Sequence, residues 1–297
     1  MTDTEDTRHS PTAPKRLPRV ALMGEFSAGK STLTNLLLSG TPLPVRVTAT
    51  RLPPVWISRG QPDAMREDLN GNFWPIDAGD LESVSLDDTR LIRLTMEEEI
   101  LHLCDLIDMP GISDPNMAPE VWERVLSEAD HVVWCTHATQ AWRQSEAAVW
   151  ETVPEELRQK SLLLVTRFDK IVSPQDRDRV LARLRRETRG LFADFFPISL
   201  TEALKAGDDR TRWDTSGAEA FVARLVDLLM DPESPGAGTY GTAGERFTRK
   251  IRSARMVHAT DVPAGTDAGP ETPAHVAPRR IRPLGQGARP LAAPRAV

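Results

Sequence analysis

The sequence lacks three features that would point to particular classes of protein. No apolar run approaches the roughly 20 residues that cross a bilayer, and the N-terminus holds no apolar segment typical of a signal peptide. There are only two cysteines, Cys104 and Cys135, each inside an apolar run where a buried free thiol is expected. There is also no excess of positive charge, since the net charge is −6. These absences argue against membrane-spanning, disulfide-rich and general nucleic-acid-binding proteins, and they favour a cytoplasmic one.

What is present divides the chain into three parts. Residues 1–18 are polar and rich in proline, which predicts a disordered N-terminal segment. Residues 19–231 carry regular hydrophobic patterns, and we interpret them as one globular domain. Residues 232–297 are dominated by Pro, Gly, Ala and Thr, which predicts a mostly disordered tail with a short helix at 244–257.

Apolar segments alternate with amphipathic ones in the middle part. Strands are predicted at residues 19–24, 91–96, 100–109, 130–136, 161–166 and 193–198. Helices are predicted at residues 30–38, 144–153, 175–189 and 217–230. This alternation is typical of an α/β fold, in which a mostly parallel sheet carries helices on both faces and binds its ligand at the carboxyl ends of the strands. Residues 61–88 are predicted to be an insertion of loops with at most one helix.

Residues 24–31, GEFSAGKS, match the phosphate-loop pattern G-x-x-x-x-G-K-S in full, between a predicted strand and a predicted helix. Glycines let backbone N–H groups approach a phosphate, and the helix N-terminus adds partial positive charge. Lys30 is expected to reach the β- and γ-phosphates, and the Ser31 hydroxyl to ligate Mg²⁺. The predicted nucleotide-binding residues of this segment are Gly24, Glu25, Phe26, Ser27, Ala28, Gly29, Lys30, Ser31 and Thr32.

The segment Asp108-Met-Pro-Gly111 follows a later apolar run. An Asp that leaves a strand beside a phosphate loop can hold Mg²⁺ through water, so Asp108 is a predicted metal-site residue. The Gly111 N–H is expected to reach the γ-phosphate. A threonine between the phosphate loop and Asp108 should close over the metal as a switch, and the candidates are Thr48 and Thr50.

Thr166-Arg-Phe-Asp169 ends another apolar run and resembles the (N/T)-K-x-D motif with which GTPases read guanine. The Asp169 carboxylate would accept from the N1–H and N2–H₂ groups of guanine, a donor pair that adenine lacks. Arg167 replaces the usual lysine and offers a similar aliphatic stem over the base. Ser199 lies in a segment similar to the late S-A-x loop that touches guanine, with Leu200 in place of the alanine.

The phosphate loop with Phe26-Ser27-Ala28 resembles that of bacterial dynamin-like proteins and, more distantly, those of mitofusins and conventional dynamins. Residues 43–60 are similar to the first switch of this family and place Thr50 at the switch threonine. The resemblance covers residues 19–231 and implies a GTPase that hydrolyses GTP to GDP and phosphate with Mg²⁺. It also implies a nucleotide-dependent homodimer, because such domains hydrolyse faster when two of them meet across the nucleotide.

The resemblance implies that Ser27, Lys30 and Thr50 are the catalytic residues, with the serine helping to position a charge-compensating cation and the attacking water. Conventional dynamins have a glutamine where this chain has Phe26, whose side chain cannot orient water. The family usually continues into a long helical stalk, which the proline-rich tail does not resemble. A helical partner subunit is therefore an expected way to supply a stalk.

The tail segment 243–259 is basic and amphipathic, with Phe247 and Ile251 on one face of the predicted helix. It suits peripheral contact with an anionic membrane or an acidic partner, and the alternatives are a solvated tail or a helix packed on the domain. Three alternatives to a dimer-activated GTPase also stay open. They are a binding switch with negligible turnover, a ribosome- or tRNA-associated GTPase, and an ATPase or kinase. The acidic domain and Thr166 argue against the second, and Asp169 argues against the third.

Overall fold

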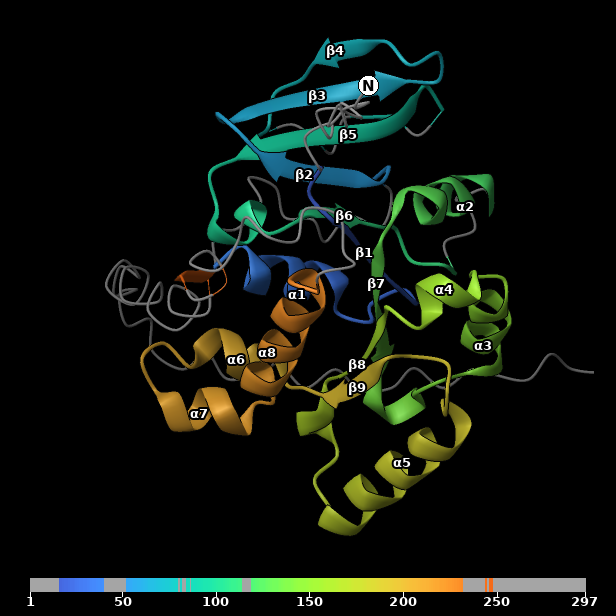
Figure 1. Ribbon diagram of the computed structural model, residues 1–297, viewed down its shortest axis with the longest axis vertical. Coiled ribbons are helices and arrows are strands. Elements are labelled where there is room, and N and C mark those ends of the chain that lie inside the picture. Colours follow the sequence, from blue (N-terminus) through green and yellow to red (C-terminus); the bar gives the residue numbers. More distant parts are fainter. Residues whose placement is uncertain are drawn as a thin grey trace, which may run out of the picture. The chain divides into compact units, whose positions relative to one another are not determined.

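The computed structural model describes residues 16–39, 52–79, 81, 84–85, 87–113, 119–231, 244 and 246–247. Within these residues one nine-stranded sheet runs in the order β4-β3-β5-β2-β6-β1-β7-β8-β9 (Figure 1). The strands are β1 Arg19–Gly24, β2 Val55–Arg59, β3 Asp63–Asp68, β4 Phe73–Pro75, β5 Thr89–Met96, β6 Asp105–Asp108, β7 His131–His137, β8 Leu162–Thr166 and β9 Asp194–Pro197. The helices are α1 Lys30–Leu37, α2 Pro119–Glu128, α3 Gln144–Glu151, α4 Glu155–Arg158, α5 Pro174–Glu187, α6 Leu200–Lys205, α7 Arg210–Thr215 and α8 Ala218–Leu229, with short 3₁₀ helices η2 Glu99–His102, η3 Ala138–Gln140 and η4 Phe168–Lys170.

The half of the sheet from β6 to β9 is parallel throughout. β1 pairs in parallel with β6 on one side and with β7 on the other, and β8 lies in parallel between β7 and β9. The strands β2 to β6 therefore lie on one side of β1, and the next strand along the chain, β7, pairs with the other side of β1. The carboxyl ends of such strands, where the order of the sheet reverses, are the place where α/β folds bind ligands.

Helices cover both faces of this half, as the alternation of the sequence predicts. In β1, Val20 and Leu22 pack into one core with side chains of α1, α6, α7 and α8. Ala21 and Met23 point the other way and pack with side chains of α2, α3, α4 and α5. Figure 1 shows α1, α6 and α8 on one side of β1 and β7, and α2, α3 and α4 on the other. The predicted α/β class, with a mostly parallel sheet, is confirmed.

The predicted insertion at residues 61–88 is wrong in kind, because it adds strands rather than loops and a helix. β3 and β4 form an antiparallel hairpin, and β3 pairs antiparallel with β5. β2 then joins β5 in parallel and β6 antiparallel, so this extension continues the main sheet. The hairpin turn is held by Asp68, whose carboxylate accepts from the backbone N–H groups of Asn70 and Asn72 and from the indole of Trp74.

The strand predicted at residues 100–109 is less than half as long as expected. β6 covers only Asp105–Asp108, and the residues before it form the 3₁₀ helix η2. Ile100 and Leu101 are fully buried in the core despite lying outside the sheet. The apolar run therefore predicts burial correctly, but burial alone does not distinguish a strand from a short helix.

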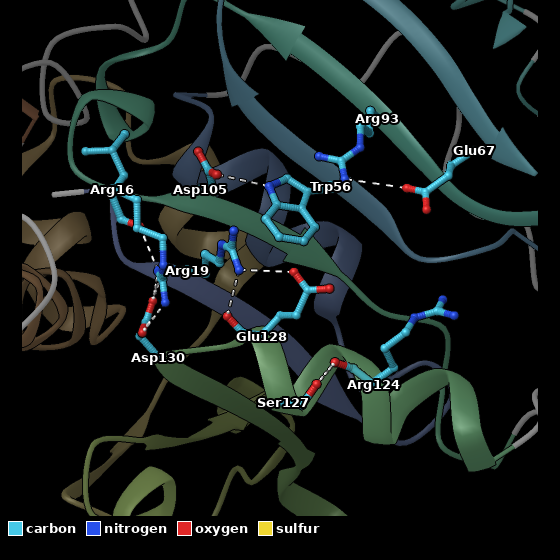
Figure 2. Close-up of polar contacts among 11 residues, drawn as sticks. Arg16, Arg19, Trp56, Glu67, Arg93, Asp105, Arg124, Ser127, Glu128 and Asp130 are labelled. Carbon is cyan, nitrogen blue, oxygen red and sulfur yellow. Dashed lines mark hydrogen bonds and ion pairs between the residues drawn. The ribbon is translucent and has the colours of Figure 1, made fainter. Parts of the chain in front are cut away.

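A cluster of charged residues joins α2 to the sheet at the amino ends of β1 and β6 (Figure 2). The Arg19 guanidinium lies 3.0 Å from the Glu128 carboxylate and 4.6 Å from the centre of the Trp56 ring. The Trp56 indole donates to the Asp105 carboxylate at 3.0 Å. Because Arg19 and Asp105 are the first residues of β1 and β6, this cluster is separate from the loops at the carboxyl ends of those strands.

The described residues of the tail, Gly244, Arg246 and Phe247, lie in the predicted helix at 244–257. Phe247 is fully buried in the same core as α8, and the Arg246 guanidinium lies 4.0 Å from the Glu99 carboxylate. Phe247 therefore packs on the domain, as in one of the alternatives above; the rest of the predicted helix lies outside the described residues. No helix in the described part of the chain has the length and apolar character needed to cross a membrane.

Candidate nucleotide-binding site

The segment between β1 and α1 forms a tight loop at the carboxyl edge of the sheet. Gly24 has a φ of 135°, and a Cβ atom there would lie 2.0 Å from the carbonyl oxygen of Cys135 on β7. Ser27 and Gly29 also have positive φ values, of 58° and 96°. Glycine is required at Gly24 because β7 leaves no room for a side chain. The loop thus adopts the compact, amide-rich conformation that suits a phosphate.

Lys30 is the first residue of α1, and its side chain curls back over the loop. Its ammonium donates to the carbonyl oxygens of Gly24 at 3.0 Å and Glu25 at 2.8 Å. Burial lowers the pKa of Lys30, and the charge of Asp108 opposes the change. The cation is therefore held against the loop backbone, within reach of a phosphate that the loop would hold.

Asp108 ends β6, beside β1, and is buried. Within the described part of the chain, neither of its carboxylate oxygens has a hydrogen-bond partner. The nearby Thr34 hydroxyl donates instead to the carbonyl of Lys30. Burial raises the pKa of Asp108 to about 6, and the charge of Lys30 opposes the rise. A buried carboxylate with unused acceptor capacity fits a hydrated divalent cation.

The segment after Asp108 contacts the phosphate loop directly. The Ile112 N–H donates to the Gly24 carbonyl at 3.2 Å, and the Phe26 N–H donates to the Ser113 hydroxyl at 3.4 Å. A Cβ atom at Gly111 would lie 2.8 Å from the Phe26 Cα, so glycine permits this approach. The Phe26 side chain itself is 53% exposed.

The end of β8 is also bonded to the loop. The Thr166 hydroxyl donates to the Ala28 carbonyl at 2.7 Å and lies 3.2 Å from the Thr136 carbonyl. Arg167 has a φ of 52°, and its guanidinium donates to the Ser27 carbonyl at 3.1 Å. Asp169 follows in η4 and is partly exposed. The segment predicted to read guanine and the phosphate loop are therefore one bonded unit.

Ser199 lies close by, at the beginning of α6. Its hydroxyl caps this helix by accepting from the Glu202 N–H, and it is almost fully buried. The Phe168 N–H donates to the Ile198 carbonyl at 3.2 Å, which brings the two loops together. The structure thus places Ser199 beside the segment that contains Asp169. Thr48 and Thr50 lie outside the described residues.

Sequence reasoning missed the start of α3, which contacts the phosphate loop from the other side. The Ser145 hydroxyl donates to the Glu25 carboxylate at 2.9 Å. Glu146 is buried and bonded to Thr136 on β7. No motif marks these residues. The available signal was a glutamate at the third position of a predicted helix, where a carboxylate reaches back to the helix start.

The order and geometry of these segments define the class. A phosphate loop after β1, a buried aspartate at the end of the neighbouring β6, and a T-R-F-D segment at the end of β8 together form a P-loop GTPase domain.

The model of the Dynamin family matches residues 20–168, which is half of the chain, and the chain therefore belongs to the Dynamin family. The resemblance seen in the phosphate loop is confirmed.

Individual relatives agree with this assignment. Dynamin-like protein 2 of Campylobacter jejuni is 20% identical over 215 residues, which cover 70% of this chain and 34% of that protein. Two solved structures of an oligomerised bacterial dynamin pair, described as sensing and tethering membranes, are each 18% identical and cover 79% of this chain. Their TM-scores are 0.54 and 0.57, and the match spans 37% and 40% of those chains. The chain thus matches little more than a third of the length of these relatives.

Proposed function

We propose that the protein binds GTP with Mg²⁺ and hydrolyses it to GDP and phosphate. The observation that carries this proposal is the bonding of Thr166 and Arg167 to the carbonyl groups of Ala28 and Ser27. It joins the predicted guanine-reading segment directly to the phosphate loop. Membership of the Dynamin family supports the same activity.

Each group has a role in this proposal. Lys30 and the loop N–H groups hold the phosphates, and the Gly111 N–H contacts the γ-phosphate. Asp169 reads the guanine, with Arg167 along the base and Ser199 beside it. The residues that would hold Mg²⁺ are Ser31, Thr50 and, through water, Asp108. When bound, Mg²⁺ supplies positive charge against the phosphate oxygens.

Hydrolysis by water in line with the leaving oxygen passes through a transition state with charge spread over the transferred group. The Lys30 ammonium is held against the loop by the carbonyl groups of Gly24 and Glu25, so we expect its contribution to need little reorganisation. Ser27, held in a left-handed conformation within the loop, helps to position the water. Phe26 contributes no polar group, so we propose that turnover is slow in a single copy and faster when two copies meet.

Two observations support the proposed homodimer. The related structures contain an oligomerised bacterial dynamin pair, and Phe26 exposes an apolar ring beside the expected γ-phosphate. Contact with a membrane surface through the basic tail, and a helical partner subunit, remain predictions. Nucleic acid is not expected as a partner.

Hydrolysis is tested by following phosphate release from GTP with Mg²⁺, with ATP as competitor. We expect turnover that ATP does not inhibit and that Lys30→Ala abolishes. That variant should also bind GTP at least about 100-fold more weakly, because it loses a charged contact to two phosphates. Lys160→Ala, at an exposed lysine, is the matched control and should behave as the natural protein does. Equal competition by ATP would contradict the proposal.

One observation favours a second candidate, a nucleotide-dependent binding switch with negligible turnover. The apolar side chain of Phe26 is exposed in the phosphate loop and offers no polar group that could orient the attacking water. Tight GTP binding without phosphate release at any protein concentration would support the switch.

A further inference from the structure

Glu146 is a buried charged residue that belongs to none of the nucleotide motifs. Its side chain is 1% exposed and lies at the third position of α3. One carboxylate oxygen accepts from the Trp134 indole at 3.0 Å. The other accepts from the Thr136 hydroxyl at 3.0 Å and from the Arg143 N–H at 2.9 Å. Both oxygens are thus used, and each by different donors.

A path of polar contacts, which crosses the backbone of Thr136, leads from Glu146 to the phosphate loop. The Thr136 hydroxyl accepts from the Trp142 N–H and donates to the Glu146 carboxylate. These two bonds fix the Thr136 side chain at the end of β7. The Thr136 carbonyl lies 3.2 Å from the Thr166 hydroxyl, which in turn donates to the Ala28 carbonyl. The connection therefore passes through the end of β8, where the guanine-reading segment begins.

A second link joins α3 to the same loop. The Ser145 hydroxyl holds the Glu25 carboxylate at 2.9 Å, and the Glu25 carbonyl accepts from Lys30 at 2.8 Å. Ser145 of α3 therefore contacts the loop through its hydroxyl. The adjacent Glu146 is connected to the loop indirectly, through Thr136 and Thr166 at the strand ends. These contacts converge on the residues on both sides of Gly29.

Glu146 also has a structural role, because its carboxylate accepts from the Arg143 N–H at the start of α3. Burying a carboxylate is costly unless its acceptor sites are used. An apolar side chain would avoid that cost but would leave the Trp134 indole, the Thr136 hydroxyl and the Arg143 N–H without this acceptor. Because both carboxylate oxygens are used, this buried group fixes the geometry of its donors.

We propose that Glu146 is a positioning residue that holds Thr136, and through it Thr166 and the phosphate loop, in the geometry that retains a guanine nucleotide. This inference rests on the proposed guanine-nucleotide binding and deepens it. Glu146 contacts no nucleotide itself. It acts by keeping the loop and the guanine-reading segment at one fixed separation, so its loss lets the bound nucleotide escape faster.

The test is the dissociation rate of fluorescently labelled GDP, chased with excess GDP. Only molecules that hold the nucleotide report this rate, so a smaller folded fraction leaves it unchanged. Glu146→Gln keeps the size of the side chain but offers one acceptor oxygen in place of two, so an amide N–H₂ must face a donor. We expect dissociation about tenfold faster, since one charged hydrogen bond is lost. Glu151→Gln, exposed on the same helix, is the matched control and should leave the rate unchanged.

A second pair of variants keeps the test informative if Glu146→Gln folds poorly. Thr136→Ala removes the hydroxyl and should also accelerate dissociation, whereas Thr136→Ser retains it and should restore the natural rate. Combining Thr136→Ala with Glu146→Gln should add little, because both variants break one connection. Rates within twofold of the natural protein for both single variants, with a lower melting temperature, would make Glu146 purely structural. Failure of the natural protein to bind labelled GDP at all would instead overturn the proposed function, and this inference with it.

Discussion

Among single residues, Asp108 carries a buried charge that is opposed by Lys30 but lacks hydrogen bonds in the described part of the chain. Its buried oxygens lack hydrogen-bond partners within the described residues, and burial raises its pKa to about 6. Asp108→Asn removes this buried charge, which should stabilise the folded state by about 3 kcal/mol. The unpaired amide group offsets part of that gain. We expect a net increase of about 1–2 kcal/mol in the free energy of unfolding without metal and nucleotide, measured by denaturant titration. The same variant should lose Mg²⁺-dependent retention of GTP. A less stable variant would contradict this account.

A second prediction concerns Asp169 and the base of the bound nucleotide. Its carboxylate is proposed to accept two hydrogen bonds from guanine. Asp169→Asn replaces one acceptor by a donor, which mismatches guanine and matches the C2 carbonyl of xanthine. GTP should bind about 100-fold more weakly and XTP more tightly, as measured by competition with labelled GDP. Asp178→Asn, at an exposed aspartate on α5, is the control. Equal weakening for both nucleotides would argue against base reading by Asp169.

The candidate site could be predicted from sequence where local chemistry determines it. Gly24 and Gly29 follow from the needs of a tight loop, and Asp108 from its place at the end of an apolar strand. Glu146 could not be predicted to matter, because its partners Trp134 and Thr136 come from a strand that precedes it. Only the packing of α3 against β7 shows that this glutamate is buried rather than exposed.

At the scale of elements, the β3–β4 hairpin depends on one carboxylate. Asp68 accepts from Asn70, Asn72 and Trp74, and these bonds lower its pKa to about 2. Because the pKa is lower in the folded state, the stabilisation is present above about pH 4 and is lost as the pH falls toward 2. Asp68→Ala should accelerate amide hydrogen exchange in residues 63–75 by about tenfold at neutral pH and leave β7 and β8 unchanged. The difference should shrink as the pH falls from about 4 through about 2. Uniformly faster exchange would show that the hairpin is not a separate unit.

The same hairpin shows where reading of the sequence failed. Only Ala64 and Glu67 of β3 are buried, and β4 is exposed along its whole length, so no buried apolar stripe marks the hairpin. Its pairing with β5 is a tertiary contact that local pattern does not contain. A signal was available in Asn70-Gly71, a dipeptide typical of tight hairpin turns. The strands β1, β7 and β8 were predicted well because burial on both faces makes them continuously apolar.

At the scale of the whole molecule, the exposed Phe26 ring distinguishes the two candidate functions. If two copies meet across the nucleotide, the ring is covered in the dimer, and turnover follows the concentration of dimer by mass action. We expect the GTPase activity per molecule to rise at least about tenfold between roughly 0.1 and 10 µM protein. Phe26→Ser should weaken this dependence.

The control for that experiment is Leu69→Ser. Leu69 is 64% exposed, more than Phe26, but it lies on the β3–β4 hairpin rather than in the phosphate loop. General hydrophobic association would respond to both substitutions, whereas association across the nucleotide responds to Phe26 alone. Activity that stays flat and near zero over the whole range, in a protein that binds GTP tightly, would favour the binding switch. It would also mean that a partner, rather than a second copy, must supply the missing catalytic group.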